Sequence, residues 1–352
     1  MLTKRFVIKL TLLTAIAVIA ACIAHYERWS ETIRNIAEDR VFPEIIDKLD
    51  QVAKIKIVRS SQNEVDNFTA VPSGNHWSIE EKGGYKTRDS AIRETLLGLT
   101  ELVYQEAKTK DPDRHHKLHL QDVSKNSSKA TRLILEDSNG DVILDALFGK
   151  RVQNLSGGTP SLYMRRSSEA QTWLTKGELE VRGDILDWLS VTLLSIQRER
   201  IQRAIFTTGS APTLELSYNK DMERFDIVGL PSNREVKSRY QVLNVGIIPE
   251  NLLLNDVRPA TLSPDSNLSK VKWQTVDGLI VKMHLAKDKD NKVKHTWAFI
   301  EASTSGTASD KVKKEAEVIT RKTEGWEFWL GDDIIKRLNS TSKSLTKPKS
   351  SD

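Results

Sequence analysis

The N-terminal part of the chain contains one long apolar run. Residues Leu10 to Ala24 read LTLLTAIAVIAACIA, and only Thr11 and Thr14 in this run are polar. A helix needs about 20 apolar residues to span a bilayer. Phe6 to Ile8 extend the run towards that length, provided that Lys9 between them reaches the headgroup region. The pattern therefore predicts an N-terminal transmembrane helix.

The charges on either side of this run predict its orientation. Lys4, Arg5 and Lys9 precede it, whereas basic and acidic residues alternate after it from Glu27 to Arg40. An excess of Lys and Arg marks the cytoplasmic side of a span. We therefore predict a single-pass inner-membrane protein with a cytoplasmic N-terminus and a periplasmic bulk. The predicted anchor side chains are Leu10, Leu12, Leu13, Ile16, Val18, Ile19 and Ile23.

Three interpretations of this N-terminal segment remain open. The first is an uncleaved signal anchor. The second treats Ile19 to Cys22 as a lipobox, which would make Cys22 a lipidated N-terminal residue after cleavage. The third is cleavage after a small residue such as Ala24. The apolar run continues through Ala24 and Trp29 follows soon after, which favours the anchor. Cys22 is the only cysteine, so an internal disulfide is excluded.

Beyond this segment, the spacing of apolar residues changes between the periods of strands and helices. Alternation predicts a strand at 54–58, and Asp137 to Gly140 predicts the turn of a hairpin between 131–136 and 141–148. Helical spacing predicts a helix from Asp89 to Leu102. A short buried helix or turn is predicted within 185–195. The other predicted elements are strands at 76–79, 162–166, 171–175, 203–207, 271–276, 279–286, 295–301 and 326–330, and helices at 31–40, 308–323 and 332–338.

Two stretches of the chain resemble each other in this pattern. Ile57 precedes Trp77 by the same number of positions as Ile205 precedes Phe225, and a predicted helix follows each stretch. Two related units in tandem would produce this similarity. So would coincidence, because strand, strand, helix is a common order. Both explanations remain open.

As a whole, the pattern predicts an α+β protein. An N-terminal transmembrane helix is followed by two tandem mixed units of twisted antiparallel sheet with packing helices. The Ser-, Thr- and Lys-rich composition of the C-terminus is typical of disorder. The predicted segments are a cytoplasmic stub and membrane anchor at 1–27, a linker helix at 28–51, a first α+β unit with a β-meander at 52–200, a second α+β unit at 201–338 and a disordered tail at 339–352.

The charge of the chain makes nucleic acid an unexpected partner. The 53 Lys and Arg residues exceed the 48 Asp and Glu residues by only five, and the two signs are interleaved. A nucleic-acid-binding protein usually gathers its basic residues, often with aromatic ones, into a stripe or patch. A mild basic excess does suit a protein that lies near an anionic membrane surface.

The most metal-like pattern is the group of histidines at 115–119. His115 and His119 are four positions apart, and on a helix they could share a divalent ion. No third ligand follows at a recognisable spacing. We therefore interpret this segment as a solvated basic turn and predict no metal site.

Other patterns that accompany chemistry elsewhere are explained by composition or by structure. Ser156 to Thr159 is interpreted as a flexible hairpin loop, and the acidic pairs Asp332-Asp333 and Asp288/Asp290 as solvated or helix-capping groups. The tryptophans are interpreted as core residues. We predict no catalytic residue and no cofactor. Ser-x-x-Lys spacings, common in a chain rich in both residues, occur at Ser217–Lys220, Ser269–Lys272, Ser340–Lys343 and Ser344–Lys347.

Short stretches spread from about residue 40 to about residue 335 resemble the bacterial family called domain of unknown function 4340. Proteins similar to this family are typically signal-anchored and are often encoded near ABC-type export systems of the gliding-motility kind. The resemblance brings no catalytic residues with it. The matching stretches are Val41-Phe42-Pro43, Val52 to Ile55, Gly74 to Ile79, Tyr85, Leu97-Gly98-Leu99, Glu106 to Pro112, Leu118 to Asp122, Leu162 to Arg165, Trp173-Leu174 and Asp277-Gly278-Leu279.

The resemblance implies a membrane-anchored extracytoplasmic accessory or scaffold subunit without catalysis of its own. Its partners would be the inner membrane and an envelope protein, with ABC-type transporter subunits as the candidates. The alternative is a periplasmic binding module for an envelope polysaccharide or lipid, and a hydrolase with an unrecognised site is the third hypothesis. An exposed apolar patch near the anchor would favour the subunit, and an aromatic-lined cleft the binding module.

Overall fold

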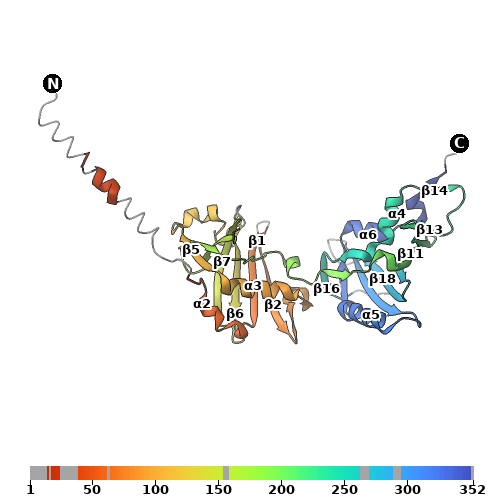
Figure 1. Ribbon diagram of the computed structural model, residues 1–352, viewed down its shortest axis with the longest axis horizontal. Coiled ribbons are helices and arrows are strands. Elements are labelled where there is room, and N and C mark those ends of the chain that lie inside the picture. The colour runs from red at the N-terminus through yellow and green to blue at the C-terminus, as the bar shows by residue number, and fades with distance from the viewer. Residues whose placement is uncertain are drawn as a thin grey trace, which may run out of the picture. The chain divides into compact units, whose positions relative to one another are not determined.

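A computed structural model describes residues 14–15, 17–23, 39–61, 64–153, 158–261, 269–287 and 295–349. The chain forms two compact units, which are seen in Figure 1. The first contains the described residues up to Glu80 together with Asp89–Trp188. The second contains Glu81–Arg88 and the chain from Leu189 onwards. The second unit therefore takes one short segment from the N-terminal half of the sequence.

Residues 14–15 and 17–23 are helical and fall within the predicted anchor. Val18, Ile19 and Ile23 are each more than half exposed, at 56%, 58% and 55%. Within the described ranges, no helix is both long enough and apolar enough to cross a membrane. The predicted anchor residues Leu10, Leu12, Leu13 and Ile16 lie outside those ranges, as do most residues of the helix predicted at 31–40.

The first unit is built on one antiparallel sheet with the strand order β3-β2-β1-β6-β7-β8-β9-β5. The long central strands confirm the predicted alternation, because Ile55, Ile57, Leu133 and Leu135 are at most 1% exposed. The strands are β1 (Lys54–Ser61), β2 (Glu64–Ser73), β3 (His76–Ile79), β5 (Val103–Ala107), β6 (Thr131–Glu136), β7 (Val142–Val152), β8 (Ser161–Arg166) and β9 (Trp173–Lys176).

The hairpin between β6 and β7 forms at the predicted turn. The Asp137 carboxylate accepts hydrogen bonds from the backbone N–H groups of Asn139, at 2.8 Å, and Asp141, at 2.9 Å. Gly140 has a φ of 87°, which only glycine adopts without strain. These local contacts set the register that pairs Leu133 with Ala146.

Two helices pack together in the first unit, and Figure 1 shows α3 across the sheet. They are α2 (Pro43–Ile46) and α3 (Asp89–Glu101), and Ile45, Ile92 and Leu99 are buried between these elements and the core. A Cβ atom on Gly98 of α3 would lie 3.1 Å from the Cα atom of Leu179. Glycine at this position therefore lets the helix approach the backbone of the chain after β9.

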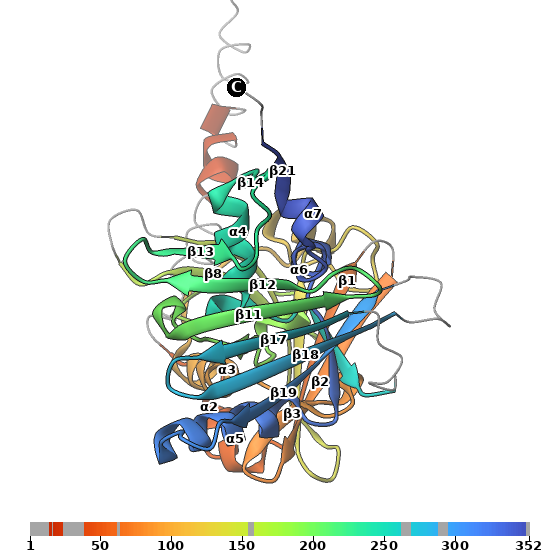
Figure 2. The same cartoon turned by 90° about the vertical axis from the view of Figure 1, so that its right-hand side faces the viewer.

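The second unit contains an eight-stranded sheet with the order β13-β12-β11-β17-β18-β19-β20-β16. Figure 2 shows β12, β11, β17, β18 and β19 side by side, with α5 next to β19. Trp273, Phe206 and Met283 are at most 1% exposed in its core. The strands are β11 (Ile201–Thr208), β12 (Leu214–Asn219), β13 (Arg224–Ile227), β16 (Asp256–Pro259), β17 (Ser269–Thr275), β18 (Leu279–Lys287), β19 (Thr296–Thr304) and β20 (Trp326–Trp329).

The two sheets have the same connectivity. In each, three consecutive strands form a meander, a helix follows, and the next strand crosses to the far edge as β5 or β16. Four strands then return to pair with the first, as β6 to β9 and as β17 to β20. Helix α5 (Asp310–Thr323) inserted before β20 is the main difference. The repeat suggested by the sequence is thus present as a repeat of connectivity, and the class is confirmed as α+β.

Shorter elements complete the two units. Helices α4 (Arg239–Gly246), α6 (Asp332–Leu338) and α7 (Ser342–Leu345) belong to the second unit, as do the paired strands β10 (Thr192–Leu194) with β15 (Leu252–Leu253) and β14 (Arg234–Val236) with β21 (Thr346–Pro348). The two-residue strand β4 (Tyr85–Lys86) lies in the segment that packs with this unit. Short 3₁₀ helices occur at Leu49–Gln51, Glu80–Lys82, Pro112–Leu118, Ile185–Asp187, Arg198–Arg200 and Ile248–Asn251.

The predicted disordered tail at 339–352 is wrong for residues 339–349. Strand β21 pairs with β14, and Leu345 and Thr346 are 5% and 1% exposed. Thr341 and Ser344 form a reciprocal capping box at the start of α7. The hydroxyl-bearing residues of this segment therefore cap a helix, as Thr341 and Ser344 do, or lie in a paired strand, as Thr346 does. The predicted boundary at 200 also differs from the observed division, which falls after Trp188.

Candidate functional site

The segment Asp39–Phe42 joins the first unit along the free edge of β5. The Tyr104 N–H donates to the Asp39 carbonyl at 2.9 Å, and the Val41 N–H donates to the Leu102 carbonyl at 2.8 Å. Arg40 and Val103 form an antiparallel bridge between these two contacts. An uncovered edge strand invites pairing with other chains. The segment therefore covers this edge of the sheet.

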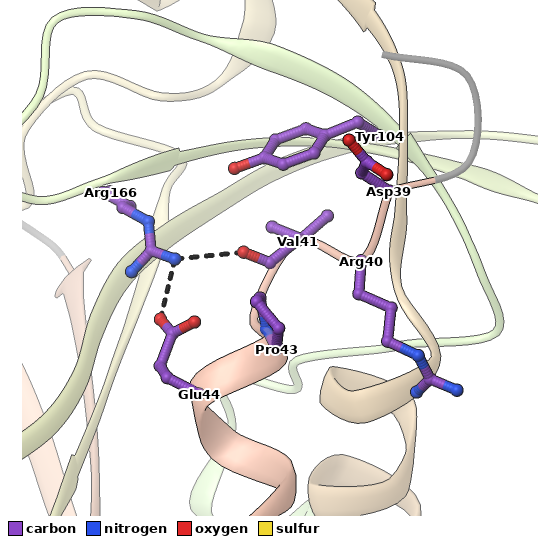
Figure 3. Close-up of a pocket in the computed structure, with 7 residues that line it drawn as sticks. All are labelled: Asp39, Arg40, Val41, Pro43, Glu44, Tyr104 and Arg166. Carbon is purple, nitrogen blue, oxygen red and sulfur yellow. Dashed lines mark hydrogen bonds and ion pairs between the residues drawn. The ribbon is translucent and has the colours of Figure 1, made fainter.

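Arg166, at the end of β8, binds this segment and the start of α2 (Figure 3). One guanidinium nitrogen donates to the Val41 carbonyl at 3.0 Å and to the Glu44 carboxylate at 2.7 Å. The guanidinium also lies over the ring of Phe42, 5.0 Å from the ring centroid. Phe42 itself is fully buried. One side chain thus binds the segment by a backbone contact, an ion pair and a cation–π contact.

Tyr104 forms the opposite side of this site. Its ring packs on Trp173, with ring centroids 4.7 Å apart. Burial raises the pKa of the Tyr104 hydroxyl, against an opposing effect of Arg166, so the hydroxyl stays protonated at neutral pH. An open depression of about 660 Å³ lies here. It is lined by Asp39, Arg40, Val41, Pro43, Glu44, Tyr104 and Arg166, which we call the joining surface.

A second depression of about 720 Å³ adjoins the joining surface and shares Arg40 and Tyr104 with it. Acidic and basic side chains alternate around both hollows. The joining surface therefore offers shape and mixed hydrogen-bonding groups, and the Arg166 guanidinium is already paired with the Glu44 carboxylate. The remaining residues of the second depression are Glu101, Val103, Gln105, Thr159, Lys176, Gly177 and Glu178.

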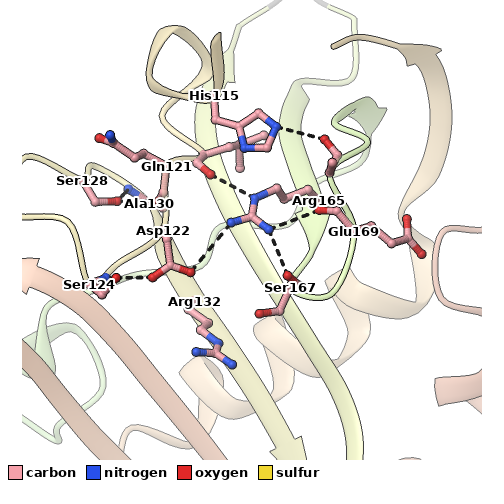
Figure 4. A network of polar contacts seen from close by, with 12 residues as sticks. His115, Gln121, Asp122, Ser124, Ser128, Ala130, Arg132, Arg165, Ser167 and Glu169 are labelled. Atoms are coloured by element: carbon pink, nitrogen blue, oxygen red, sulfur yellow. Dashed lines mark hydrogen bonds and ion pairs between the residues drawn. The ribbon is translucent and has the colours of Figure 1, made fainter. Parts of the chain in front are cut away.

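Arg165, the neighbour of Arg166, holds a separate polar network, shown in Figure 4. Its side chain is 8% exposed and donates to the carbonyls of Leu120 at 3.0 Å and Ser167 at 3.1 Å. It also contacts the Asp122 carboxylate at 3.9 Å. Further carbonyl contacts, at 3.3 Å, come from Arg166 and Glu169. This buried guanidinium ties the loop after β8 to the loop around Leu120.

The histidines at 115–119 do not form the arrangement that a shared metal ion requires. They lie in a 3₁₀ turn, where His115 is buried and its Nε2 contacts the Ala170 carbonyl at 2.9 Å. His119 ends the turn in the left-handed region, with a φ of 58°. Burial lowers the pKa values of both imidazoles. In the described part of the chain, no three His, Cys, Asp or Glu side chains are grouped to hold a metal.

The other sequence candidates take structural positions. Ser269 and Lys272 lie three apart in β17, on opposite faces of the strand, and the Ser269 hydroxyl donates to Asn339 at 2.6 Å. Asp333 forms an ion pair with Arg337 at 3.0 Å within α6. Cys22 is exposed among the helical residues 17–23. Ser156, Gly157, Asp288 and Asp290 lie outside the described ranges.

Sequence reasoning missed the joining surface. Arg166 and Glu44 are 122 positions apart, and neither belongs to a motif. One signal was present: Arg165 and Arg166 end an otherwise apolar strand pattern, where two adjacent charges need partners.

The protein is of the α+β class, its two units contain sheets with the same strand connectivity, and the joining surface lies on the first of them. The sequence profile of the family described as "Domain of unknown function (DUF4340)" matches residues 77–268. This range is more than half of the chain, and it runs from β3 in the first unit to the residues after β16 in the second. The chain therefore belongs to the DUF4340 family. No curated protein matches the sequence.

Proposed function

We propose that this protein is a non-catalytic scaffold or accessory subunit, anchored in the inner membrane and folded on the periplasmic side. We further propose that it binds an envelope protein, with ABC-type transporter subunits as the candidates that the family resemblance supplies. The observation that carries the proposal is the attachment of Asp39–Phe42 to the edge of β5.

This attachment matters because it limits how far the first unit can lie from the N-terminal helical residues. Residues 24–38 connect Ile23 to Asp39, and these two residues can be at most about 58 Å apart when the connection is fully extended. The apolar side chains of Val18, Ile19 and Ile23 are exposed, as residues that face lipid would be. An anchor here would hold the joining surface close to the membrane.

The chemistry of the joining surface favours a protein partner. Its charged groups are of both signs, the Arg166 guanidinium is already paired with Glu44, and Tyr104 offers a ring and a protonated hydroxyl. Protein interfaces combine aromatic and arginine side chains with a polar rim in this way. Two adjoining open hollows suit a partner that covers a broad area.

Anchoring is tested by placing charge in the apolar segment. The double substitution Val18→Lys with Ile19→Lys should release the protein from membranes, because each lysine costs about 3 kcal/mol at the centre of a span. The measurement is fractionation of cells with carbonate washing. Val142→Lys, at an exposed apolar position of β7, is the matched control. Equal membrane retention of the double variant would contradict the anchor.

Partner binding is tested by photo-crosslinking in intact cells. A photo-reactive amino acid replaces the exposed Gln105 beside Tyr104, and, as the control, the exposed Met222 of the second unit. Mass spectrometry of the purified adducts should recover transporter subunits from the Gln105 position alone. Adducts that are the same at both positions, or none at all, would refute the proposed interface.

A further inference from the structure

A groove in the second unit runs between β10 and α5. It is open to solvent along its length and has a volume of about 500 Å³. Its floor is apolar, and its rim carries the charged residues of α5 and Arg200. The floor consists of the buried Leu193, Leu194, Ile196 and Ile319, with the exposed Val318 at its edge, and the rim of Ser195, Arg200, Lys311, Lys314 and Glu315.

The fold keeps this groove open. Strand β10 pairs with β15 on one side only, and α5 contacts it on the other. The Lys322 ammonium of α5 donates to the Thr192 carbonyl at one end of the groove. Helix α5 buries Val312, Ala316 and Ile319, whereas Val318 is 55% exposed. Val318 is thus an apolar residue on the same surface of α5 that lines the groove.

The uncompensated charge of the groove is positive. Two guanidinium nitrogens of Arg200 bind the Glu315 carboxylate, at 2.9 and 2.7 Å, and Asp277 lies 2.9 Å from the same side chain. The exposed Lys311 and Lys314 form no ion pair with any residue in the described part of the chain. At about 100° per residue, Lys311 and Lys314 lie about 20° and 40° from Val318 around the helix axis, so all three share one side of α5. The groove thus combines an apolar floor with two free ammonium groups.

We infer that this groove binds a long-chain fatty-acid anion. The acyl chain lies against Leu193, Leu194 and Val318, and the carboxylate accepts charge-assisted hydrogen bonds from Lys311 and Lys314. The volume falls within the range of small-molecule sites. An acidic peptide would need donors along the whole length of the groove, whereas the ammonium groups gather on one helix. This inference concerns a different unit from the joining surface and holds with or without the proposed partner.

The experiment uses a fatty acid that carries a diazirine at the chain terminus and the full-length protein in lipid nanodiscs. Irradiation followed by peptide mass spectrometry should place the label at 193–196 and 314–319. The double substitution Lys311→Glu with Lys314→Glu should lower this labelling about tenfold, because the carboxylate loses both charged donors. The alcohol with the same chain and diazirine should label the groove only weakly.

Lys313→Glu is the matched control, because Lys313 lies on the opposite side of α5 and pairs with Asp310 at 3.1 Å. It should leave the labelling unchanged. Circular dichroism establishes that the double variant and the control keep the fold of the wild type. Labelling that is equal in the double variant, equal with the alcohol, or confined to residues outside the groove would overturn the inference. Binding of the protein to anionic vesicles without label in the groove would overturn it as well, in favour of a membrane-surface contact.

Discussion

Arg165 and Arg166 are neighbours on β8, yet they stabilise different parts of the first unit. Successive side chains of a strand point to opposite faces. Arg165 therefore reaches the carbonyls of Leu120 and Ser167, whereas Arg166 reaches Val41 and Glu44. The buried Arg165 has most of its partners on the backbone, so its role is to hold loops, and its geometry depends on the planar guanidinium.

Arg165→Lys should lower the free energy of unfolding by about 2–3 kcal/mol, because one ammonium group cannot reach all the carbonyls and leaves buried acceptors unpaired. Urea denaturation measures this loss. Arg203→Lys, at a side chain 49% exposed and paired with Glu215, is the control and should change stability by less than about 0.5 kcal/mol. Equal losses in the two variants would show that the Arg165 network is not structurally important.

His115 should make stability depend on pH. Burial lowers the pKa of His115, with Arg165 acting in the same direction and Asp111 against it, so the unfolded chain binds a proton at a higher pH than the folded one. The contribution of His115 to the free energy of unfolding is therefore complete at pH values above the ordinary imidazole pKa of about 6.5. It declines as the pH falls below that pKa.

Melting temperatures measured above and below that pH should differ less in His115→Gln than in the wild type. The glutamine keeps a donor for the Ala170 carbonyl and cannot gain the proton. His116→Gln, at an exposed ring of the same turn, is the matched control for the substitution itself. His119 titrates in all three proteins and cancels in the comparison. An unchanged slope in His115→Gln would contradict this prediction.

At the level of elements, Asp39–Phe42 acts as the outermost segment of the first sheet. A chain that begins at Pro43 should lose at least about 3 kcal/mol, since it lacks the fully buried Phe42 ring. It should also aggregate through the uncovered edge of β5. A chain that begins at Asp39 keeps both features and is the control. Thermal unfolding and light scattering distinguish the two, and equal behaviour would show that the edge needs no cover.

Elements with local causes were predictable from the sequence. The β6–β7 hairpin follows from alternation around Asp137 to Gly140, and β1 from the pattern of Ile55 and Ile57. Strands β2, β5, β12 and β16 were not predicted. For β5 and β16 the reason is that each is short and its place at the far edge depends on pairing with a distant strand. The ordered C-terminus was missed for the same reason, since β21 pairs with β14 more than a hundred positions earlier. The joining surface rests on contacts of this long-range kind.

On the scale of the whole molecule, the second unit is not a continuous piece of sequence. Within it, Lys82 forms an ion pair with Asp256 of β16 at 2.6 Å. Tyr85 is 2% exposed, and its ring meets those of Trp326 and Phe328 edge-on, at 5.0 and 6.1 Å. The segment Glu81–Arg88 thus supplies part of the core beside β20, although it lies in the N-terminal half of the chain.

Tyr85→Ala should therefore destabilise the second unit by about 3–4 kcal/mol, because it removes a buried ring from an aromatic cluster. Hydrogen exchange of the full chain should show lost protection in β20 and unchanged protection in β6 and β7. Tyr85→Phe keeps the ring contacts and loses only the hydroxyl bond to the Ser190 carbonyl, so it should retain nearly all protection. Loss of protection in β6 and β7 instead would refute this assignment.

The position of this segment also sets an order of events during synthesis. The ribosome makes the chain from the N-terminus, so Lys82 and Tyr85 are synthesised long before their partners. Asp256, the partner of Lys82, is 174 positions further along the chain. Strands up to β9 can pair in the meantime, but the Tyr85 ring still lacks its aromatic neighbours Trp326 and Phe328. Uncovered apolar groups of this kind attract aggregation and chaperones. The two halves of this protein therefore cannot mature strictly one after the other, and a pause in synthesis after β9 would leave the strands of the first sheet paired while the segment Glu81–Arg88 still lacks its partners.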